Sequence, residues 1–224
     1  MEKHVIIVAG GIGKRFGANI PKQFVRLAGK PILLHTLERF YSYSSDIKIV
    51  VVLPKEQLET WNNICAEFSV TISHQLVAGG SQRFFSVKNG LSFVPDGALV
   101  AIHDGVRPFV SCATLERTFA TAETFTNAIP VMPVNESIRL CYGASSTTFD
   151  RNKIKIVQTP QIFHSSILKK AYRQPFKELF TDDASVVEAM GRQIHLVEGN
   201  SENIKITTPF DLAVGEAIFA KENK

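Results

Sequence analysis

Short apolar runs that alternate with helical patterns constrain the fold of this 224-residue chain most strongly. Five runs rich in β-branched residues are predicted to be strands: residues 5–8, 47–53, 99–102, 128–134 and 194–197. Their hydrophobicity is continuous rather than alternating, which is typical of strands that helices cover on both faces. The order of the segments therefore predicts an α/β fold with a doubly wound, mostly parallel sheet.

Helical patterns lie between these runs. A first helix is expected from Pro31, since proline is tolerated in the first turn, and others at about 56–68, 82–93 and 112–124. The last helix is expected to begin at Thr208, because Asp211 three positions later completes the pattern of a capping box. Asp182 and Asp183 are expected to cap a further helix that runs to residue 190.

Residues 135–158 interrupt this alternation. Within them, residues 137–142 and 153–157 alternate polar with apolar side chains, and residues 143–146 supply a turn, which predicts a projecting β-hairpin arm. A lone hairpin is only marginally stable in water, so we expect the arm to pack against a second subunit. Because no repeat, low-complexity tract or linker interrupts residues 1–224, we expect a single domain.

Composition and charge exclude several classes of protein. The apolar content of 45% fits one well-cored globular domain. The net charge of +4 favours anionic ligands, but no Lys/Arg-rich block indicates a nucleic-acid surface. No apolar stretch reaches the roughly 20 residues that span a bilayer. Cys65, Cys112 and Cys141 are far apart and typical of thiols in a reducing compartment, and the N-terminus passes directly into a predicted strand. We therefore expect a cytoplasmic protein.

A glycine-rich loop follows the first apolar run. Gly10, Gly11 and Gly13 lie within four residues, and the cations Arg15 and Lys22 come next. Glycines allow backbone N–H groups to surround an anion, because no Cβ blocks a close approach. The two cations add charge that backbone dipoles cannot supply. This arrangement predicts a loop that holds the phosphates of a nucleotide.

Two common nucleotide-binding loops do not fit these residues. In a dinucleotide-binding loop the third glycine would stand at position 16, where this chain has Phe16, and the second apolar run ends in Pro54-Lys55 without a carboxylate for a ribose. A dinucleotide oxidoreductase is therefore disfavoured. A Walker loop requires Ser or Thr after its Gly-Lys pair, but Arg15 stands there.

Further polar segments follow the predicted strands, where an open α/β sheet binds its ligands. They are Pro21-Lys-Gln23, Gly79-Gly-Ser-Gln-Arg-Phe-Phe-Ser86, His103-Asp-Gly-Val-Arg-Pro108, Asp150-Arg151, Gln158-Thr-Pro-Gln161, Thr181-Asp-Asp-Ala-Ser185 and Asn203-Ile-Lys205. The ordered set resembles the cytidylyltransferases of the non-mevalonate isoprenoid pathway. That family joins 2-C-methyl-D-erythritol 4-phosphate to CTP and releases pyrophosphate. The A-x-G-x-G-x-R motif alone marks many sugar-nucleotide transferases, whereas its combination with H-D-x-x-R-P, T-P-Q and N-I-K is specific.

The resemblance implies a Rossmann-like fold of the nucleotide-diphospho-sugar transferase type and a nucleotidyltransferase activity. It implies that main-chain atoms of a loop wrap the cytidine and triphosphate, namely those of Ala9, Gly10, Gly11, Ile12 and Gly13. It implies three catalytic cations that hold phosphates and stabilise the transition state, namely Arg15, Lys22 and Lys205. It also implies that Gly80, Ser81 and Ser86 line the cytosine pocket.

By the same resemblance, the acceptor sugar phosphate is bound by Asp104, Arg107, Ser137, Arg151, Thr159 and Thr181. Arg151 would reach it from the other subunit of a homodimer that is formed through the arm. Mg²⁺ is the implied cofactor, bound mainly through the CTP phosphates, because Mg²⁺ keeps waters and takes few protein carboxylates. Asp104 is the candidate metal ligand from the protein.

Phosphate chemistry explains why these residue types suffice. The attacking phosphate monoester has a second pKa of about 6, so it is ionised at pH 7 and needs no general base. Catalysis then consists of positioning and charge neutralisation. The acceptor stays open at this point, because Ala9-Gly10-Gly11 replaces the usual Ala-Ala-Gly and resembles a sister family that uses ribitol 5-phosphate. A non-catalytic nucleotide-binding module is a further alternative, disfavoured by the three cations.

Overall fold

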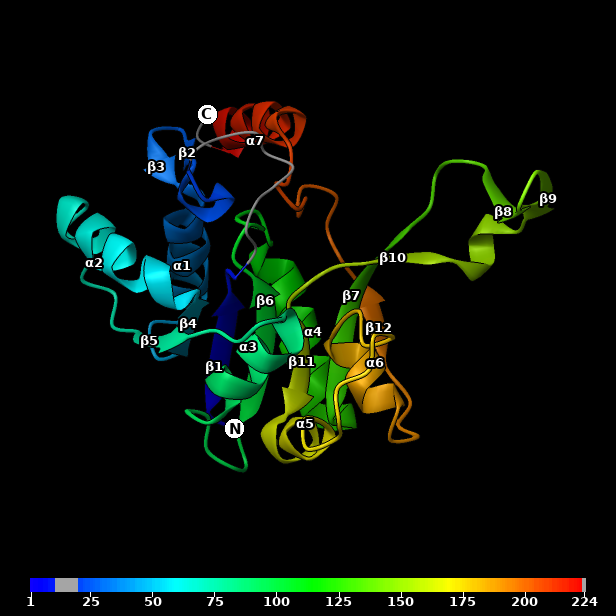
Figure 1. Cartoon of the computed structure of the whole chain (residues 1–224), viewed down its shortest axis with the longest axis horizontal. Helices are drawn as coiled ribbons and strands as arrows, with labels where there is room; N and C mark the ends of the chain where they lie inside the picture. Colours follow the sequence, from blue (N-terminus) through cyan, green and yellow to red (C-terminus); the bar gives the residue numbers. More distant parts are fainter. Residues whose placement is uncertain (11–19, 223–224) are drawn as a thin grey trace.

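An eight-stranded sheet forms the core of the computed structural model, which describes residues 1–10 and 20–222 (Figure 1). Its strands are β1 (Lys3–Val8), β4 (Lys48–Leu53), β5 (Gln75–Ala78), β6 (Leu99–Asp104), β7 (Asn127–Pro133), β10 (Lys155–Val157), β11 (Gln161–His164) and β12 (Leu196–Glu198). They follow the order β10-β7-β11-β6-β1-β4-β5, and β12 pairs with β7. The pairs of β1 with β4 and β6, of β4 with β5 and of β7 with β12 are parallel, whereas β10 and β11 run antiparallel to their neighbours. The predicted α/β fold with a mostly parallel sheet is confirmed.

Helices cover both faces of this sheet. On one face, α1 (Ile32–Tyr43), α2 (Leu58–Glu67) and α4 (Cys112–Phe125) pack against odd-numbered strand residues such as Val5 and Ile7. On the other, α3 (Arg83–Leu91), α5 (Ser165–Ala171) and α6 (Asp183–Glu188) pack against even-numbered residues such as Ile6 and Val100. Burial from both sides explains why the central strands are continuously apolar.

The last helix, α7 (Pro209–Glu222), lies beyond the carboxyl ends of β1 and β6, beside the short strands β2 (Arg26–Leu27) and β3 (Lys30–Pro31) (Figure 1). Its predicted capping box is present. The Thr208 N–H donates to Asp211 Oδ2 at 2.8 Å, and the Asp211 N–H donates to Thr208 Oγ1 at 3.2 Å. None of the helices in residues 1–10 and 20–222 combines the length and hydropathy that crossing a bilayer requires.

The hairpin arm projects from the body, but its second strand differs from the prediction (Figure 1). Strand β8 (Ile138–Tyr142) pairs antiparallel with β9 (Ser145–Phe149), so the turn consists of Gly143 and Ala144. The tight turn explains the difference, because Gly143 adopts a φ of +63°, a conformation that glycine accepts and two-residue turns require. Residues 153–157, which were predicted to pair within the arm, instead contribute β10 to the main sheet.

Candidate active site

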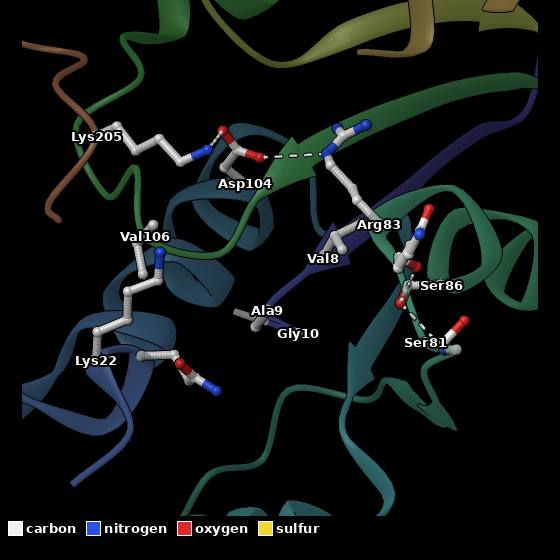
Figure 2. Close-up of a pocket in the computed structure, with 13 residues that line it drawn as sticks. Val8, Ala9, Gly10, Lys22, Ser81, Arg83, Ser86, Asp104, Val106 and Lys205 are labelled. Atoms are coloured by element: carbon white, nitrogen blue, oxygen red, sulfur yellow. Dashed lines mark hydrogen bonds and ion pairs between the residues drawn. The ribbon is translucent and has the colours of Figure 1, made fainter. Parts of the chain in front are cut away.

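A pocket opens beyond the carboxyl ends of β1 and β6 (Figure 2). Its lining comes from segments far apart in the chain: Val8, Ala9, Gly10, Lys22, Gln23, Gly80, Ser81, Gln82, Arg83, Ser86, Asp104, Val106 and Lys205. Eight of these residues were predicted site residues, namely Ala9, Gly10, Lys22, Gly80, Ser81, Ser86, Asp104 and Lys205. The sheet therefore gathers them at the edge where ligands of such folds bind.

The glycine pair at the start of α3 forms one wall of this pocket. The Ser86 hydroxyl accepts the Gly80 N–H at 3.1 Å and donates to the Gln82 carbonyl at 3.1 Å, which holds the loop against the first turn of the helix. A Cβ at Gly80 would collide with the Cβ of Phe85, so only glycine permits this close approach. The buried Ser86 is therefore a support of the loop, and the exposed Ser81 lies on its surface.

Asp104, the last residue of β6, stands among three cations. Its Oδ2 lies 3.0 Å from Lys205 Nζ and 3.3 Å from Arg107 Nε, and its Oδ1 lies 3.7 Å from Arg83 Nε. Burial opposes ionisation of this carboxyl, but the charges of Arg83, Lys205 and Arg107 outweigh burial and hold its pKa well below the usual range. The carboxylate thus organises the cations on its side of the pocket.

The next glycine brings this carboxylate close to the predicted phosphate loop. A Cβ at Gly105 would lie 2.8 Å from the Cβ of Ala9 and 3.0 Å from Leu33 Cδ1. The Gly105 N–H donates to the Val8 carbonyl at 2.9 Å. The ends of β6 and β1 are therefore in contact, and Asp104 and Ala9 line the same pocket.

His103 supports Asp104 from behind and is neutral. Its Nε2 lies 2.9 Å from the Arg107 carbonyl, which can only accept, so Nε2 carries the proton. Its Nδ1 therefore accepts from the Thr159 hydroxyl at 3.1 Å, and the same hydroxyl accepts the Asp104 N–H at 3.1 Å. Burial is the main cause that lowers the pKa of His103 to about 4. The imidazole thus positions the main chain of Asp104 and Arg107.

The neutral His103 predicts how stability depends on pH. The unfolded chain protonates this residue near its ordinary pKa of 6.5 and the folded chain only near 4, so stability falls as the pH falls through that window. We expect the free energy of unfolding, measured in urea, to fall between pH 7 and pH 4 in the wild type. In His103→Gln this fall should be smaller by roughly 3 kcal/mol. The glutamine keeps a donor and an acceptor in the cavity. Equal losses in the two proteins would mean that His103 does not carry this dependence.

The carboxylate of Asp104 does not fit a divalent cation. Three positively charged groups already surround it, and a further dication among them would be repelled. Within residues 1–10 and 20–222, no group of three or more His, Cys, Asp and Glu side chains could hold a metal ion.

The remaining predicted site residues fall into three groups according to where they lie relative to the pocket. Arg107 and Thr159 contact Asp104 from outside the pocket lining, and Arg107 also donates to the Asn203 carbonyl at 2.7 Å. Three exposed residues are not among the lining residues, namely Ser137, Arg151 and Thr181. Four others lie outside the described residues, namely Gly11, Ile12, Gly13 and Arg15.

Sequence reasoning missed Arg83 and misassigned Asp183. Asp182 is the N-cap of α6, as predicted, because its side chain accepts the Ser185 N–H at 2.9 Å. Asp183 does not cap the helix: its side chain is fully buried and its Oδ2 accepts from Arg83 Nη2 at 2.7 Å. The sequence signal that could have identified Arg83 is its position as a cation three residues after the Gly79-Gly80 pair.

Comparisons with known proteins agree with this geometry. The family model of 2-C-methyl-D-erythritol 4-phosphate cytidylyltransferase (IspD) matches residues 3–221. The enzyme of that name from Bacteroides thetaiotaomicron is 51% identical over 97% of this chain and 100% of its own length. The one from Bacillus velezensis is 40% identical over 100% of this chain and 98% of its own length. The crystal structure of the Thermus thermophilus enzyme has a TM-score of 0.79 at 32% identity and covers 97% of this chain and 98% of that one. The resemblance inferred from the sequence is confirmed: the chain belongs to the 2-C-methyl-D-erythritol 4-phosphate cytidylyltransferase family.

Proposed function

We propose that this protein transfers the cytidylyl group of CTP to 2-C-methyl-D-erythritol 4-phosphate in isoprenoid precursor biosynthesis. The products are 4-diphosphocytidyl-2-C-methyl-D-erythritol and pyrophosphate. The observation that carries the proposal is a single pocket whose lining includes Lys22, Lys205, Gly10 and residues of the Gly80–Ser86 wall (Figure 2). Membership of the family supports the choice of nucleotide and acceptor.

The reaction is a displacement at phosphorus. An oxygen of the acceptor phosphate attacks the α-phosphorus of CTP, a new P–O bond forms, and the bond to the β-phosphate oxygen breaks to release pyrophosphate. The attacking oxygen is ionised at pH 7, so no side chain needs to remove a proton. The neutral His103, which is fully buried and bonded at both ring nitrogens, is accordingly given no role as a base.

The roles proposed for the described residues follow from the charges of their side chains. The ammonium groups of Lys22 and Lys205 offset the negative charge that crowds at the α-phosphorus, and Arg15 is proposed to join them. The carboxylate of Asp104 repels phosphate, so in this proposal it accepts hydrogen bonds from the polyol hydroxyls of the acceptor. Gly80 and Ser81 are proposed to read the cytosine ring through main-chain and hydroxyl groups.

Mg²⁺ is proposed to enter with the nucleotide, bound by oxygens of the triphosphate, because the charges around Asp104 disfavour it there. When bound in this way it neutralises phosphate charge. The protein residues, in contrast, orient the two substrates and hold the attacking oxygen in line with the leaving group.

The exposed arm supports a homodimer in which each site borrows a residue from its partner. Leu140 and Tyr142 on β8 are exposed large side chains, and a two-stranded ribbon alone is only marginally stable. Arg151, at the base of the arm, is proposed to reach the acceptor phosphate of the other subunit. Cytoplasmic location is proposed because Cys65, Cys112 and Cys141 are free thiols, as is usual in a reducing compartment.

Pyrophosphate release measured with different substrate pairs tests the function. With CTP and Mg²⁺, 2-C-methyl-D-erythritol 4-phosphate should react faster than ribitol 5-phosphate. UTP should react at least about tenfold more slowly than CTP, because a buried hydrogen-bond partner of the cytosine amino group would lose its bond. Faster turnover of ribitol 5-phosphate would reassign the acceptor, which the Ala9-Gly10-Gly11 sequence keeps as the second candidate. Absence of pyrophosphate with every pair would reject nucleotidyl transfer.

A further inference from the structure

Arg83 lies between two carboxylates that belong to different elements of the fold, and Figure 2 shows its contact with one of them, Asp104. Its Nη2 lies 2.7 Å from Asp183 Oδ2 on α6, and its Nε lies 3.7 Å from Asp104 Oδ1 on β6. Burial disfavours the charged guanidinium, but the charges of Asp183 and Asp104 outweigh burial and raise its pKa further above the ordinary range. A permanently charged side chain therefore connects the start of α3 to the end of β6.

The Asp183 end of this connection is fixed. The Asp183 side chain is fully buried, and the Tyr172 hydroxyl donates to its Oδ1 at 2.6 Å. Burial is the main cause that raises the pKa of Tyr172 well above its usual value, so the hydroxyl keeps its proton. The Tyr172 ring also stacks on Phe84, the neighbour of Arg83, with 4.6 Å between ring centroids. The guanidinium is thus held at its outer nitrogen and leaves Nε facing Asp104.

The other end of this connection, Asp104, holds the ammonium of Lys205, which is a candidate catalytic residue. Arg83 faces Oδ1, while Lys205 and Arg107 face Oδ2, so cations restrain both oxygens of the carboxylate. Of these three cations, Arg83 is the one that faces Oδ1, so without it the carboxylate gains freedom to turn. The Lys205 side chain is 41% exposed and its ammonium lies 3.0 Å from Asp104, so its position depends on this carboxylate.

We propose that Arg83 is a positioning residue for the acceptor half of the site. It fixes the carboxylate of Asp104 and, through it, the ammonium of Lys205, without needing to touch either substrate. Small displacements of such groups reduce transition-state stabilisation, because the productive geometry is narrow. This inference rests on the proposed function and adds a residue to its machinery.

Arg83→Met tests the inference, since methionine keeps much of the side-chain length and removes the charge. The KM for the acceptor phosphate should rise about tenfold or more with a lower kcat, while the KM for CTP should change less than about threefold. Arg83→Lys should recover part of the loss, because an ammonium can meet one carboxylate but not both. Arg117→Met is the matched control: this guanidinium donates to the Glu198 carbonyl at 2.9 Å outside the pocket, and the KM for each substrate should stay unchanged.

A second variant keeps the test informative if Arg83→Met fails to fold. Arg83→Met leaves Asp183 as a buried unpaired charge, so Arg83→Met/Asp183→Asn is measured beside it, with Tyr172 still bonded to an amide oxygen. A folded variant with an unchanged KM for the acceptor, or with equal rises in KM for both substrates, overturns the positioning role. The proposed function fails separately, if wild-type protein releases no pyrophosphate from CTP and the acceptor.

Discussion

Replacement of Lys22 by alanine is expected to lower the kcat for pyrophosphate release by about a hundredfold or more, while the protein remains folded. Lys22 begins the short helix η1 (Lys22–Phe24), and the buried Gln23 and Phe24 fix this helix beside the pocket. The half-buried ammonium faces the pocket across from Ser86 and Ser81 (Figure 2). Its charge counts most where negative charge increases during the reaction, so the loss should appear in kcat.

Lys55→Ala is the matched control for this measurement. Lys55 is an exposed lysine in another short helix, η2 (Lys55–Gln57), and does not line the pocket, so its removal should leave kcat unchanged. Circular dichroism and thermal unfolding establish that both variants are folded. An unchanged kcat with a raised KM for CTP would reduce Lys22 to a residue that binds substrate and transition state equally.

Replacement of Arg151 by alanine is expected to reduce kcat/KM for the acceptor by about a hundredfold, with little change in the KM for CTP. Arg151 lies in the short helix η3 (Arg151–Lys153), where its exposed guanidinium donates to the Asn135 carbonyl at the base of the arm. It is not a lining residue of the pocket of its own chain. An arginine suits an acceptor phosphate because its planar fork can donate two hydrogen bonds.

Mixed dimers separate a role in the partner from a role in the same chain. Dimers that combine Arg151→Ala with Lys22→Ala should regain activity in one of their two sites, because one site then has both native residues. Arg139→Ala is the control on the same arm, since Arg139 donates to Ser146 of the arm itself at 2.8 Å and should not affect the acceptor. Mixed dimers as inactive as both parents would exclude a shared site.

The strands that can be predicted from the sequence are those whose own side chains form a continuous apolar run. The continuous β-branched runs of β1, β4, β6 and β7 are recognisable because both faces of each strand are buried. Strands β5 and β11 were not predicted, because each has four residues and begins with glutamine. Their strand character comes from pairing with β4 and β6, which no local pattern records.

In the candidate site, too, local sequence patterns are predictable and long-range contacts are not. Glycines next to cations, and the His103-Asp104 pair at the end of a run, are local signals that predicted much of the pocket. The role of Asp183 is not local, because its ionic partner Arg83 lies 100 residues earlier in the chain. A pair of aspartates before a helix predicts caps, and only the packing of α6 near α3 shows that one of them is buried instead.

The arm of β8 and β9 has a consequence for the response of the protein to dilution. Its exposed Leu140 and Tyr142 receive little cover from their own chain. If another copy covers them, subunit association and arm stability obey one mass-action equilibrium, and specific activity falls once the protein concentration drops below the dissociation constant. Below that concentration the protein would keep its sheet and its pocket while it loses Arg151 from each site, so a folded monomer would be an inactive one.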